Sequence, residues 1–310
     1  MTQPSGPRLI DAAATRAALP MDKLVEALRE AFVAGAEIPL RHRHALPEAS
    51  SLLLMPAWQG RTALGVKIVT VFPGNGALGL NAVSSTYLLC DGETGKHIAI
   101  IDGNEITGRR TAAASALAGH YLARADAAHL LIVGSGHVAG LMAEAWRAVR
   151  PIANVAVWNV REAGAQRLAA ELRAQGFAAT ATNDLQAAVG EADIVSCATL
   201  SQAPLVQGAW LRPGTHLDLV GAYMPTMREC DDAAVRRARI FIDTDAALAE
   251  AGDIIQPLQA GVIARDAIEG TLFSLCRGEV QGRRGAEEIT LFKSVGSAIE
   301  DLAAAALVVA

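Results

Sequence analysis

The chain has 310 residues, 27 of them basic and 32 acidic, and a formal net charge of −5. A single hydrophobic core rarely grows beyond roughly 250 to 300 residues, so we expect two domains. The slightly acidic balance argues against a nucleic-acid-binding protein, which would carry clustered positive charge. We therefore expect a small-molecule ligand.

The cysteines and the apolar segments indicate a soluble cytoplasmic protein. The four cysteines are widely spaced and form no Cys-x-x-Cys pair, so we expect reduced thiols and no zinc site. The N-terminal stretch contains no continuous apolar region of the kind found in signal peptides. No other apolar run approaches the ~18 residues of a membrane span, so no membrane contact is expected.

The first third of the chain predicts an α+β domain. Residues 20–35 have helical spacing, and strands are expected at 50–56, 62–72, 85–91 and 96–101, separated by Gly, Asn and Asp turns. Such short strands in succession indicate an antiparallel sheet. A helix rich in small residues is expected at 113–123, leading into the next domain.

From residue 129 onward, strands and helices alternate. Strands are expected at 129–133, 154–159, 177–183, 193–199, 215–222 and 239–245, with amphipathic helices between several of them. This pattern predicts an α/β domain of the Rossmann type, a doubly wound parallel sheet covered on both faces. The last segment, 289–310, is expected to be a helix that packs back on the first domain. We accordingly predict a first domain over 1–118, completed by 292–310, and a Rossmann domain over 119–291.

The segment "LLIVGSGHVA" carries the pattern G-x-G-x-x-A, with Gly134, Gly136 and Ala139 at its fixed positions. It follows a buried strand and opens a helix, the context in which the pattern binds a dinucleotide. The first glycine allows a tight turn, the second lets the backbone approach the pyrophosphate, and the helix N-terminus attracts the anion. An ordinary glycine turn is the alternative interpretation.

The end of the second strand of this domain indicates which dinucleotide is bound. NAD enzymes usually place Asp or Glu there, to contact the ribose hydroxyls. This chain instead has Asn159 and, two residues later, Arg161. Because neither of these positions holds a carboxylate that would repel a 2′-phosphate and a guanidinium is close by, NADP(H) is favoured, with NAD(H) possible. Alternatively, Arg161 is only a solvated residue at the start of the next helix.

The segment "DGNEITGRRTAAASALA" suggests an anion site. We interpret Thr111 as a helix N-cap, which would put Arg109 and Arg110 at the positive end of a helix. Cations are disfavoured there, so a negative group should compensate them. A substrate carboxylate would suit the planar fork of arginine. A structural ion pair, for instance with Glu105, is the alternative, especially for Arg109.

Lys67 lies within an apolar strand, where an unpaired ammonium group is costly to bury. It either extends to solvent or faces a cleft with an anionic partner or a lowered pKa. Arg41 and Arg43 are weaker candidates for the same cleft. His42 and His44 share one strand face, but no carboxylate or cysteine accompanies them, so we expect no metal site.

Several longer segments resemble the ornithine cyclodeaminase and mu-crystallin family. They are "GVKIVTVFPGN", "DGETGKHIAIIDGNEITGRRTAAASALA", "IVGSGHVA", "PGTHLDLVGAYMPTMRECDD" and "LFKSVGSAIED", and together they span nearly the whole chain. The resemblance implies a homodimer whose first domain binds the substrate and forms the dimer interface. It also implies that Lys67 and Arg110 hold the substrate carboxylate, with Arg41 as a further arginine.

The family includes cyclodeaminases, alanine dehydrogenases, cyclic ketimine reductases and hormone-binding crystallins. In the cyclodeaminases an Asp follows the strand that ends at a Gly-Ala or Gly-Gly pair, where it handles the substrate amino groups and a water. This chain has Tyr223 there, after Gly221 and Ala222. A phenol with an ordinary pKa of about 10 cannot act as that base at neutral pH. Cyclodeamination is therefore disfavoured.

Our first hypothesis is NAD(P)H-dependent reduction of Δ1-pyrroline-2-carboxylate to L-proline and of Δ1-piperideine-2-carboxylate to L-pipecolate. Lys67 and Arg110 would act with Tyr223, which either donates a hydrogen bond near the ring nitrogen or only fills space beside the nicotinamide. Two alternatives stay open: an ornithine cyclodeaminase or alanine dehydrogenase, and a crystallin-like protein that binds NADPH and a small carboxylate with little turnover.

The remaining site predictions concern binding. For the substrate we assign, besides Lys67 and Arg110, Arg41 and Thr86. For the cofactor we assign residues of the glycine loop and of the strand ends, namely Gly134, Ser135, Gly136, His137, Val138, Ala139, Asn159, Arg161, Thr199, Val220, Gly221, Lys293 and Ser294.

Overall fold

The protein is described by a computed structural model over residues 6–310, so the first five residues of the N-terminal stretch lie outside the described part. The chain divides into two compact units. One comprises Met1–Arg110 with Ser297–Ala310, and the other Thr111–Gly296. Each unit contains one β-sheet, of six and eight strands respectively.

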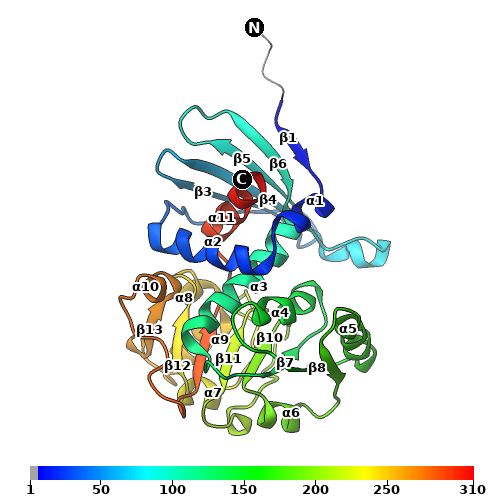
Figure 1. Cartoon of the computed structure of the whole chain (residues 1–310), viewed down its shortest axis with the longest axis vertical. Helices are drawn as coiled ribbons and strands as arrows, with labels where there is room; N and C mark the ends of the chain where they lie inside the picture. The colour runs from blue at the N-terminus through cyan, green and yellow to red at the C-terminus, as the bar shows by residue number, and fades with distance from the viewer. Residues whose placement is uncertain (1–5) are drawn as a thin grey trace. The chain divides into compact units, whose positions relative to one another are not determined.

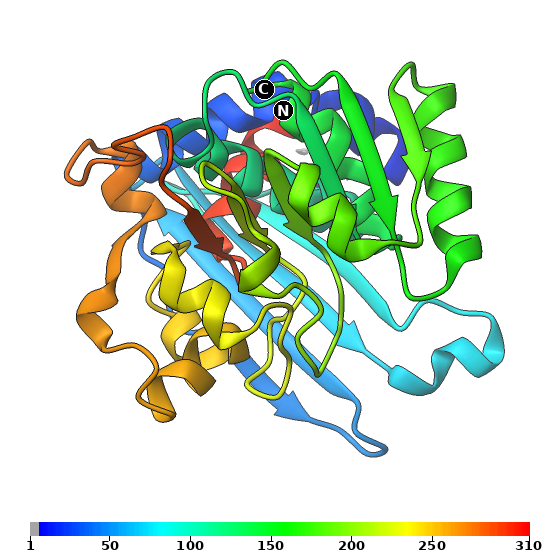
Figure 2. The same ribbon diagram turned by 90° about the horizontal axis from the view of Figure 1, so that it is seen from below.

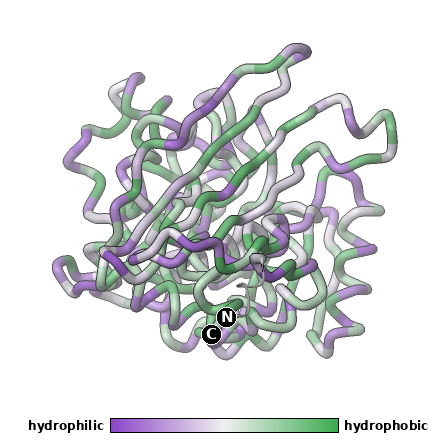
Figure 3. Tube along the Cα trace, turned by 90° about the horizontal axis from the view of Figure 1, so that it is seen from above, coloured by the Kyte–Doolittle hydropathy of each residue, from purple (hydrophilic) through white to green (hydrophobic). Residues whose placement is uncertain are grey.

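The six-stranded sheet of the first unit has the order β1-β6-β5-β4-β3-β2. Its strands are β1 (Arg8–Ile10), β2 (His42–Ala45), β3 (Ser51–Gln59), β4 (Ala63–Val71), β5 (Val83–Asp91) and β6 (His97–Asp102). Strands β2 to β6 pair antiparallel, as the sequence predicts, whereas β1 joins the edge parallel to β6. In Figure 3, hydrophobic and hydrophilic residues follow one another along these strands.

Three helices complete the first unit: α1 (Ala12–Ala18), α2 (Met21–Ala34) and α11 (Ala298–Val309). Helix α2 starts after Pro20 and buries Met21, Leu24, Leu28 and Phe32, spaced by three and four residues along one face. Helix α11 contacts α2 and strands β3, β4 and β5 (Figure 1). The C-terminal helix therefore belongs to the core of the first unit.

Helix α3 (Gly103–Leu122) begins earlier than predicted. The Asp102 side chain accepts a hydrogen bond from the Glu105 backbone N–H at 2.8 Å, which caps the helix at its true start. Thr111 lies in the middle of this helix, so its interpretation as an N-cap is wrong. Arg109 and Arg110 are consequently not at a helix N-terminus, so a positive helix end is not a reason to expect a negative group beside them.

The eight-stranded sheet of the second unit has the order β13-β12-β14-β11-β10-β7-β8-β9, with every pair parallel. Its strands are β7 (His129–Val133), β8 (Asn154–Trp158), β9 (Ala178–Ala181), β10 (Ile194–Cys197), β11 (His216–Leu219), β12 (Arg239–Ile242), β13 (Ile268–Thr271) and β14 (Thr290–Lys293). The chain order reverses between β7 and β10, which confirms the doubly wound Rossmann topology.

Helices connect the strands of the second unit. They are α4 (His137–Arg147), α5 (Glu162–Ala174), α6 (Leu185–Glu191), α7 (Asp232–Arg237), α8 (Ala247–Glu250), α9 (Gly252–Gln259) and α10 (Leu272–Cys276). Helix α4 contacts β7, and α5 contacts β8 and β9. Figure 2 shows strands of this sheet side by side, with their connecting helices. None of the helices within residues 6–310 combines the length and the apolar character that a bilayer span requires.

The end of the chain differs from the prediction of one helix over 289–310. Residues Thr290–Lys293 form strand β14, which inserts between β11 and β12 of the second sheet, and only Ala298–Val309 are helical. Leu291 and Phe292 are fully buried in this central position. The chain therefore closes the second sheet just before it returns to the first unit.

Candidate functional site

The glycine loop of the second unit lies between β7 and α4. Gly134 has φ of 118°, a conformation that only glycine adopts without strain, and a Cβ there would lie 2.6 Å from the Ala198 carbonyl oxygen. A Cβ on Gly136 would meet no heavy atom of the described residues within 4 Å. Gly136 caps α4, where no side chain satisfies the first N–H groups. The loop thus offers open space and free donors, which fit a pyrophosphate.

The other loop residues support this geometry. Ala139 is buried against the sheet, whereas Gly136 and His137 are exposed. Arg167, on α5, donates from Nη2 to the Ser135 carbonyl oxygen at 3.0 Å. The sequence analysis did not identify this contact, because Arg167 lies on a helix facing the loop only in the folded chain. It ties the loop to the helix that follows β8.

Asn159 and Arg161 follow β8, as expected for residues near an adenosine ribose. The Asn159 side chain donates to the Arg161 carbonyl oxygen at 3.0 Å, and Arg161 is the exposed N-cap residue of α5. A Cβ on Gly164 would come within 2.7 Å of the Asn159 amide nitrogen, so α5 starts close against this turn. The guanidinium of Arg161 remains accessible to a bound phosphate.

The predicted cofactor residues beyond β10 and β11 fall into two groups. Thr199, Val220 and Gly221 lie at the carboxyl ends of β10 and β11, where a doubly wound sheet binds its ligand. Lys293 and Ser294 are buried below that surface: Lys293 forms ion pairs within the unit, and the Ser294 hydroxyl donates to Asp243 at 3.0 Å. Their placement does not present them to a ligand.

Tyr223 follows Ala222 and keeps 40% of its surface exposed. Its neighbour Ala222 is fully buried, so the chain turns outward at the phenol. The aromatic ring therefore belongs to the surface at the strand ends rather than to the core.

In the first unit, Lys67 and Arg110 form one buried charge cluster with two acids of helix α11. Lys67 Nζ donates to Asp301 Oδ1 at 2.8 Å, and Arg110 Nε donates to the same oxygen at 2.8 Å. Arg110 Nη1 donates to Glu300 Oε2 at 2.6 Å. All four side chains are buried. We call this set, Lys67, Arg110, Glu300 and Asp301, the charge cluster.

The charge cluster shifts the acidity of its members. Burial lowers the pKa of Lys67 to about 8; the charge of Asp301 opposes this effect, and Arg110 adds to it. Burial by itself would raise the pKa of Asp301, but Arg110 and Lys67 hold it below its ordinary value. The lysine therefore carries a proton at neutral pH that it can release more easily than an ordinary lysine.

These contacts decide between the earlier interpretations. Lys67 does not extend to solvent, because it is buried and paired with Asp301. Arg110 takes part in ion pairs within the protein, as its alternative interpretation held, but with Glu300 and Asp301; Glu105 instead accepts from Arg16. Arg110 Nη2 has no hydrogen-bond partner among the residues that the structure describes, so one side of its guanidinium remains available to a carboxylate. Arg109 donates to the Leu19 carbonyl oxygen at 2.7 Å and has a structural role.

The structure does not bring every predicted substrate residue to the charge cluster. Lys67 pairs across the strands with Tyr87, so their side chains share a face of the sheet. Thr86, the neighbour of Tyr87, is exposed and points to the opposite face. Arg41 lies just before β2, whose residues His42 and His44 are exposed.

Glu300 and Asp301 are functional candidates that the sequence analysis missed. Both belong to the segment predicted to return to the first domain, but their partners lie 190 or more residues away in the chain. Their position in the sequence did contain a clue, because both acids lie at the start of an otherwise apolar helix. Acids on a helix that is buried require partners of opposite charge.

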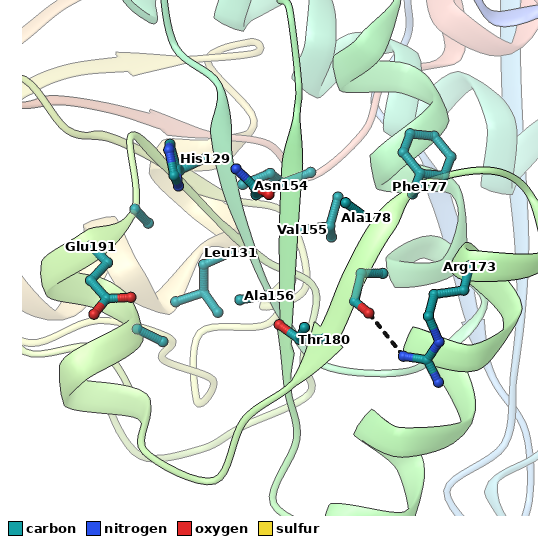
Figure 4. Close-up of a pocket in the computed structure, with 14 residues that line it drawn as sticks. His129, Leu131, Asn154, Val155, Ala156, Arg173, Phe177, Ala178, Thr180 and Glu191 are labelled. Carbon is teal, nitrogen blue, oxygen red and sulfur yellow. Dashed lines mark hydrogen bonds between the residues drawn. The ribbon is translucent and has the colours of Figure 1, made fainter.

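A cavity in the second unit lies away from the predicted binding surface. It is lined by His129, Leu131, Asn154, Val155 and Thr180, among others, and Arg173 donates to the Ala179 carbonyl oxygen at its rim (Figure 4). The lining comes from the first parts of β7 and β8 together with β9 and α6, whereas the glycine loop follows the end of β7. The cavity is therefore distinct from the loop. Within residues 6–310, no group of three or more His, Cys, Asp or Glu is placed to hold a metal ion.

The topology, the glycine loop at the end of β7 and the α+β unit with its charge cluster define a two-unit protein of the Rossmann-type oxidoreductase class. The sequence model of the ornithine cyclodeaminase/mu-crystallin family matches residues 8–310. The chain belongs to this family.

Relatives within the family have known names. The chain is 41% identical over 276 residues to a Δ1-pyrroline-2-carboxylate reductase of Paracoccus denitrificans, covering 85% of this chain and 87% of that protein. It superimposes with a TM-score of 0.93, at 34% identity, on the Δ1-pyrroline-2-carboxylate reductase of Thermococcus litoralis in complex with NADH and L-proline, covering 97% and 96% of the two chains. An archaeal alanine dehydrogenase dimer with bound NAD gives a TM-score of 0.92 at 30% identity, covering 97% and 94%.

Proposed function

We propose that the protein reduces cyclic imino acids with NAD(P)H, converting Δ1-pyrroline-2-carboxylate to L-proline and Δ1-piperideine-2-carboxylate to L-pipecolate. The observation that carries this proposal is the buried Lys67–Arg110 pair in a chain that also has an open glycine loop. The 41% identity to a pyrroline-2-carboxylate reductase supports it. The NADH and L-proline bound to the Thermococcus relative are of the expected chemical kinds.

The bound nicotinamide would supply a hydride to C2 of the imine, and the ring nitrogen would take up a proton. Arg110 would bind the substrate carboxylate through Nη2, because its Nε and Nη1 are held by Asp301 and Glu300. Lys67 would contact the same carboxylate or give its proton to the ring nitrogen, for which a pKa of about 8 is suited at neutral pH. Tyr223 would border the ring or donate a hydrogen bond near the nitrogen.

The direct test is the oxidation of NADPH or NADH by the purified protein with each cyclic imine. We expect turnover with at least one imine, and L-proline or L-pipecolate as product. A protein with neither activity would contradict the proposal. The Arg110→Lys variant should raise KM for the imine, because a point charge replaces the planar donor group.

The same assay separates the alternatives within the family. Cofactor-dependent ammonia release from L-alanine would select an alanine dehydrogenase, an activity named for the archaeal structural relative. Ammonia release from ornithine would select a cyclodeaminase, although Tyr223 stands where that chemistry uses an acid. Tight binding of NADPH and a small carboxylate without turnover would select a crystallin-like binding protein.

We further propose a preference for NADPH over NADH, because the residue directly after β8 is Asn159 rather than an acid and Arg161 is exposed close by, with Glu162 following it as the first residue of α5. The relatives named above were solved with NADH or NAD, so both cofactors should be compared. The Arg161→Ala variant should lower the ratio of kcat/KM with NADPH to that with NADH. An unchanged ratio would show that Arg161 does not contact a 2′-phosphate.

We propose that the protein forms a homodimer through its first unit. Strand β4, its end and the start of β5 expose the apolar side chains of Ile68, Phe72 and Val83, by 40%, 41% and 42%, and a dimer interface over this part of the sheet would cover them. The archaeal relative was solved as a dimer. Light scattering after size exclusion should give twice the chain mass, and Ile68→Asp should give a monomer.

We also propose a cytoplasmic location, supported by four free cysteines, three of which are buried. Fractionation of the cells that produce the protein would test it. Recovery from an oxidising compartment would contradict it.

A further inference from the structure

Glu229 is a fully buried carboxylate in the second unit that the proposed reaction does not use directly. It lies after the loop that leaves β11 and just before α7. A buried carboxylate is costly unless its oxygens accept hydrogen bonds or face a cation. The partners of Glu229 therefore show what it stabilises.

Each oxygen of Glu229 binds a different loop. Oε1 accepts from the Thr199 backbone N–H at 2.7 Å and from the Thr199 hydroxyl at 2.9 Å, beyond the end of β10. Oε2 accepts from the N–H groups of Gly221 and Ala222 at 2.9 and 3.0 Å, beyond the end of β11. One side chain thus joins the two loops at the carboxyl ends of neighbouring strands.

The loops approach each other as closely as their backbones permit. A Cβ on Gly221 would lie 2.1 Å from both the N and O atoms of Thr199 and 2.6 Å from Glu229 Oε1. Any larger residue at position 221 would separate the loops. The glycine and the carboxylate therefore act on the same contact.

The carboxylate is itself held by charges beneath it. Lys293 Nζ lies 3.6 Å from Glu229 Oε2 and 3.1 Å from Asp253 Oδ2. Asp253 Oδ1 accepts from the backbone N–H groups of Glu229 and Cys230, at 2.8 and 3.2 Å. Lys293 compensates buried negative charge, and Asp253 fixes the backbone of Glu229. Within the described residues, the side chains of Lys293 and Asp253 form no hydrogen bond with Thr199, Gly221 or Ala222.

The position of the two loops in the sheet indicates which half of a dinucleotide they would face. In a doubly wound sheet the ligand lies across the carboxyl ends of the strands at the switch point, with its pyrophosphate at the first loop. Here the first loop follows β7 and the predicted ribose site follows β8. The adenosine half would occupy the β8 side, which leaves the nicotinamide half to the side of β10 and β11.

We propose that Glu229 is a positioning residue that holds the Thr199 and Gly221–Ala222 loops in the arrangement that receives the nicotinamide half of the cofactor. This inference rests on the proposed dinucleotide binding. In this arrangement Glu229 does not contact the cofactor, and Lys293 compensates the buried charge of Glu229 and Asp253 below the loops.

The test compares whole and truncated ligands on the Glu229→Gln variant. NADH contains the nicotinamide, and ADP-ribose lacks it; NADPH and 2′-phospho-ADP-ribose form the matching pair. In the variant, an amide NH₂ replaces one oxygen, so two donors of one loop lose their acceptor: the Gly221 and Ala222 N–H groups, or the N–H and hydroxyl of Thr199. We expect NADH affinity to fall roughly ten-fold or more, while ADP-ribose affinity changes less than about two-fold.

A general loss of structure would weaken both ligands alike, and this outcome, or no change in either, would overturn the inference. If Glu229→Gln does not fold, Glu229→Asp serves instead: it keeps the charge but is too short to reach both loops, and the same selective loss is expected. An equal effect on both ligands would overturn the inference there as well.

Asp253→Asn is the matched control, because it removes a charge from the same buried network, while the amide oxygen of Asn keeps an acceptor for the Glu229 and Cys230 N–H groups and Glu229 keeps both of its own oxygens for the loops. It should change NADH and ADP-ribose affinity equally; a selective loss of NADH binding would mean that charge, not loop position, is responsible. Failure of the wild-type protein to bind NADH or NADPH would instead contradict the proposed function.

Discussion

Replacing Asp301 by Asn tests how the charge cluster controls Lys67. Asp301 Oδ1 lies 2.8 Å from the Lys67 ammonium group. At an effective dielectric constant of about 20, this charge pair contributes at most about 6 kcal/mol. Even if only a quarter of that energy, about 1.5 kcal/mol, is lost with the carboxylate, the pKa of Lys67 changes by about one unit.

The direction of the effect follows from the charges. The pKa of Lys67 is about 8 because burial lowers it, while Asp301 favours the ammonium form and Arg110 disfavours it. Without the carboxylate the proton is lost more easily, so the pKa of Lys67 should fall by at least about one unit. If Lys67 supplies the proton, kcat/KM of the wild-type protein should decline above about pH 8, and Asp301→Asn should move this decline to lower pH.

The assay is the pH dependence of kcat/KM for imine reduction in both proteins. Titration of the imine substrate itself is common to both, so the difference between the profiles isolates the protein group. Glu93→Gln, which neutralises an exposed acid paired with Arg61 in the same unit, is the control and should leave the profile unchanged. An unmoved decline in Asp301→Asn, or one displaced to higher pH, would refute the reasoning.

Three further predictions concern the second unit. Burial raises the pKa of Asp218 to about 6, so the folded chain binds more protons than the unfolded chain between about pH 4 and 6, and stability falls as pH rises through this window. Asp218→Asn should therefore be more stable than the wild-type protein at pH 7.5, with a free energy of unfolding in urea higher by up to about 3 kcal/mol. The two proteins should differ little near pH 4, and equal stability at pH 7.5 would contradict the prediction. Gly136→Val should keep the melting temperature but lose dinucleotide binding, since open space surrounds a Cβ there, whereas Gly134→Ala should lower the melting temperature because its Cβ would strike the Ala198 carbonyl. The opposite pattern in calorimetry and ligand titration would exclude the loop assignment. Tyr223→Phe should lower kcat if the hydroxyl donates a hydrogen bond, and unchanged turnover would leave the ring with a packing role only.

The second unit was the more predictable from sequence, because strand and helix patterns repeat there in a regular order. The strands from β7 to β12 were expected close to their true bounds. Strand β14 was missed because "ITLFK" was merged with the helix that follows. Its β-branched and aromatic residues before Ser-Val-Gly do have strand character. Its insertion between β11 and β12 is a long-range pairing that no local pattern contains.

The start of α3 illustrates a local signal that was misinterpreted. In the sequence analysis we interpret Thr111 as the cap. Asp102 followed three residues later by Glu105 is itself the signature of a helix start, and the hydrogen bond between them is present. The correct boundary is therefore readable from the sequence, and it removes the argument that placed Arg109 and Arg110 at a positive helix end.

The partners of Lys67 and Arg110 could not be predicted in the same way. For Lys67 the sequence left open an extension to solvent or an anionic partner, and the structure has the partner. For Arg110 the structure has negative groups beside it, although the N-cap argument for them was wrong. The acids that provide this negative charge stand at positions 300 and 301, and only the docking of α11 on β4 brings them to the cations. Local patterns show that a charge needs a partner but not which distant residue provides it.

The position of these acids also bears on the order in which the chain folds during its synthesis. Lys67 and Arg110 emerge from the ribosome 234 and 191 residues before Asp301. The second unit, Thr111–Gly296, is complete before α11 exists. The first unit, although it is made first, must keep two buried cations uncompensated or solvated until the last helix arrives, because domains fold as their segments become available. We therefore expect the first unit to complete its folding only after α11 has been synthesised.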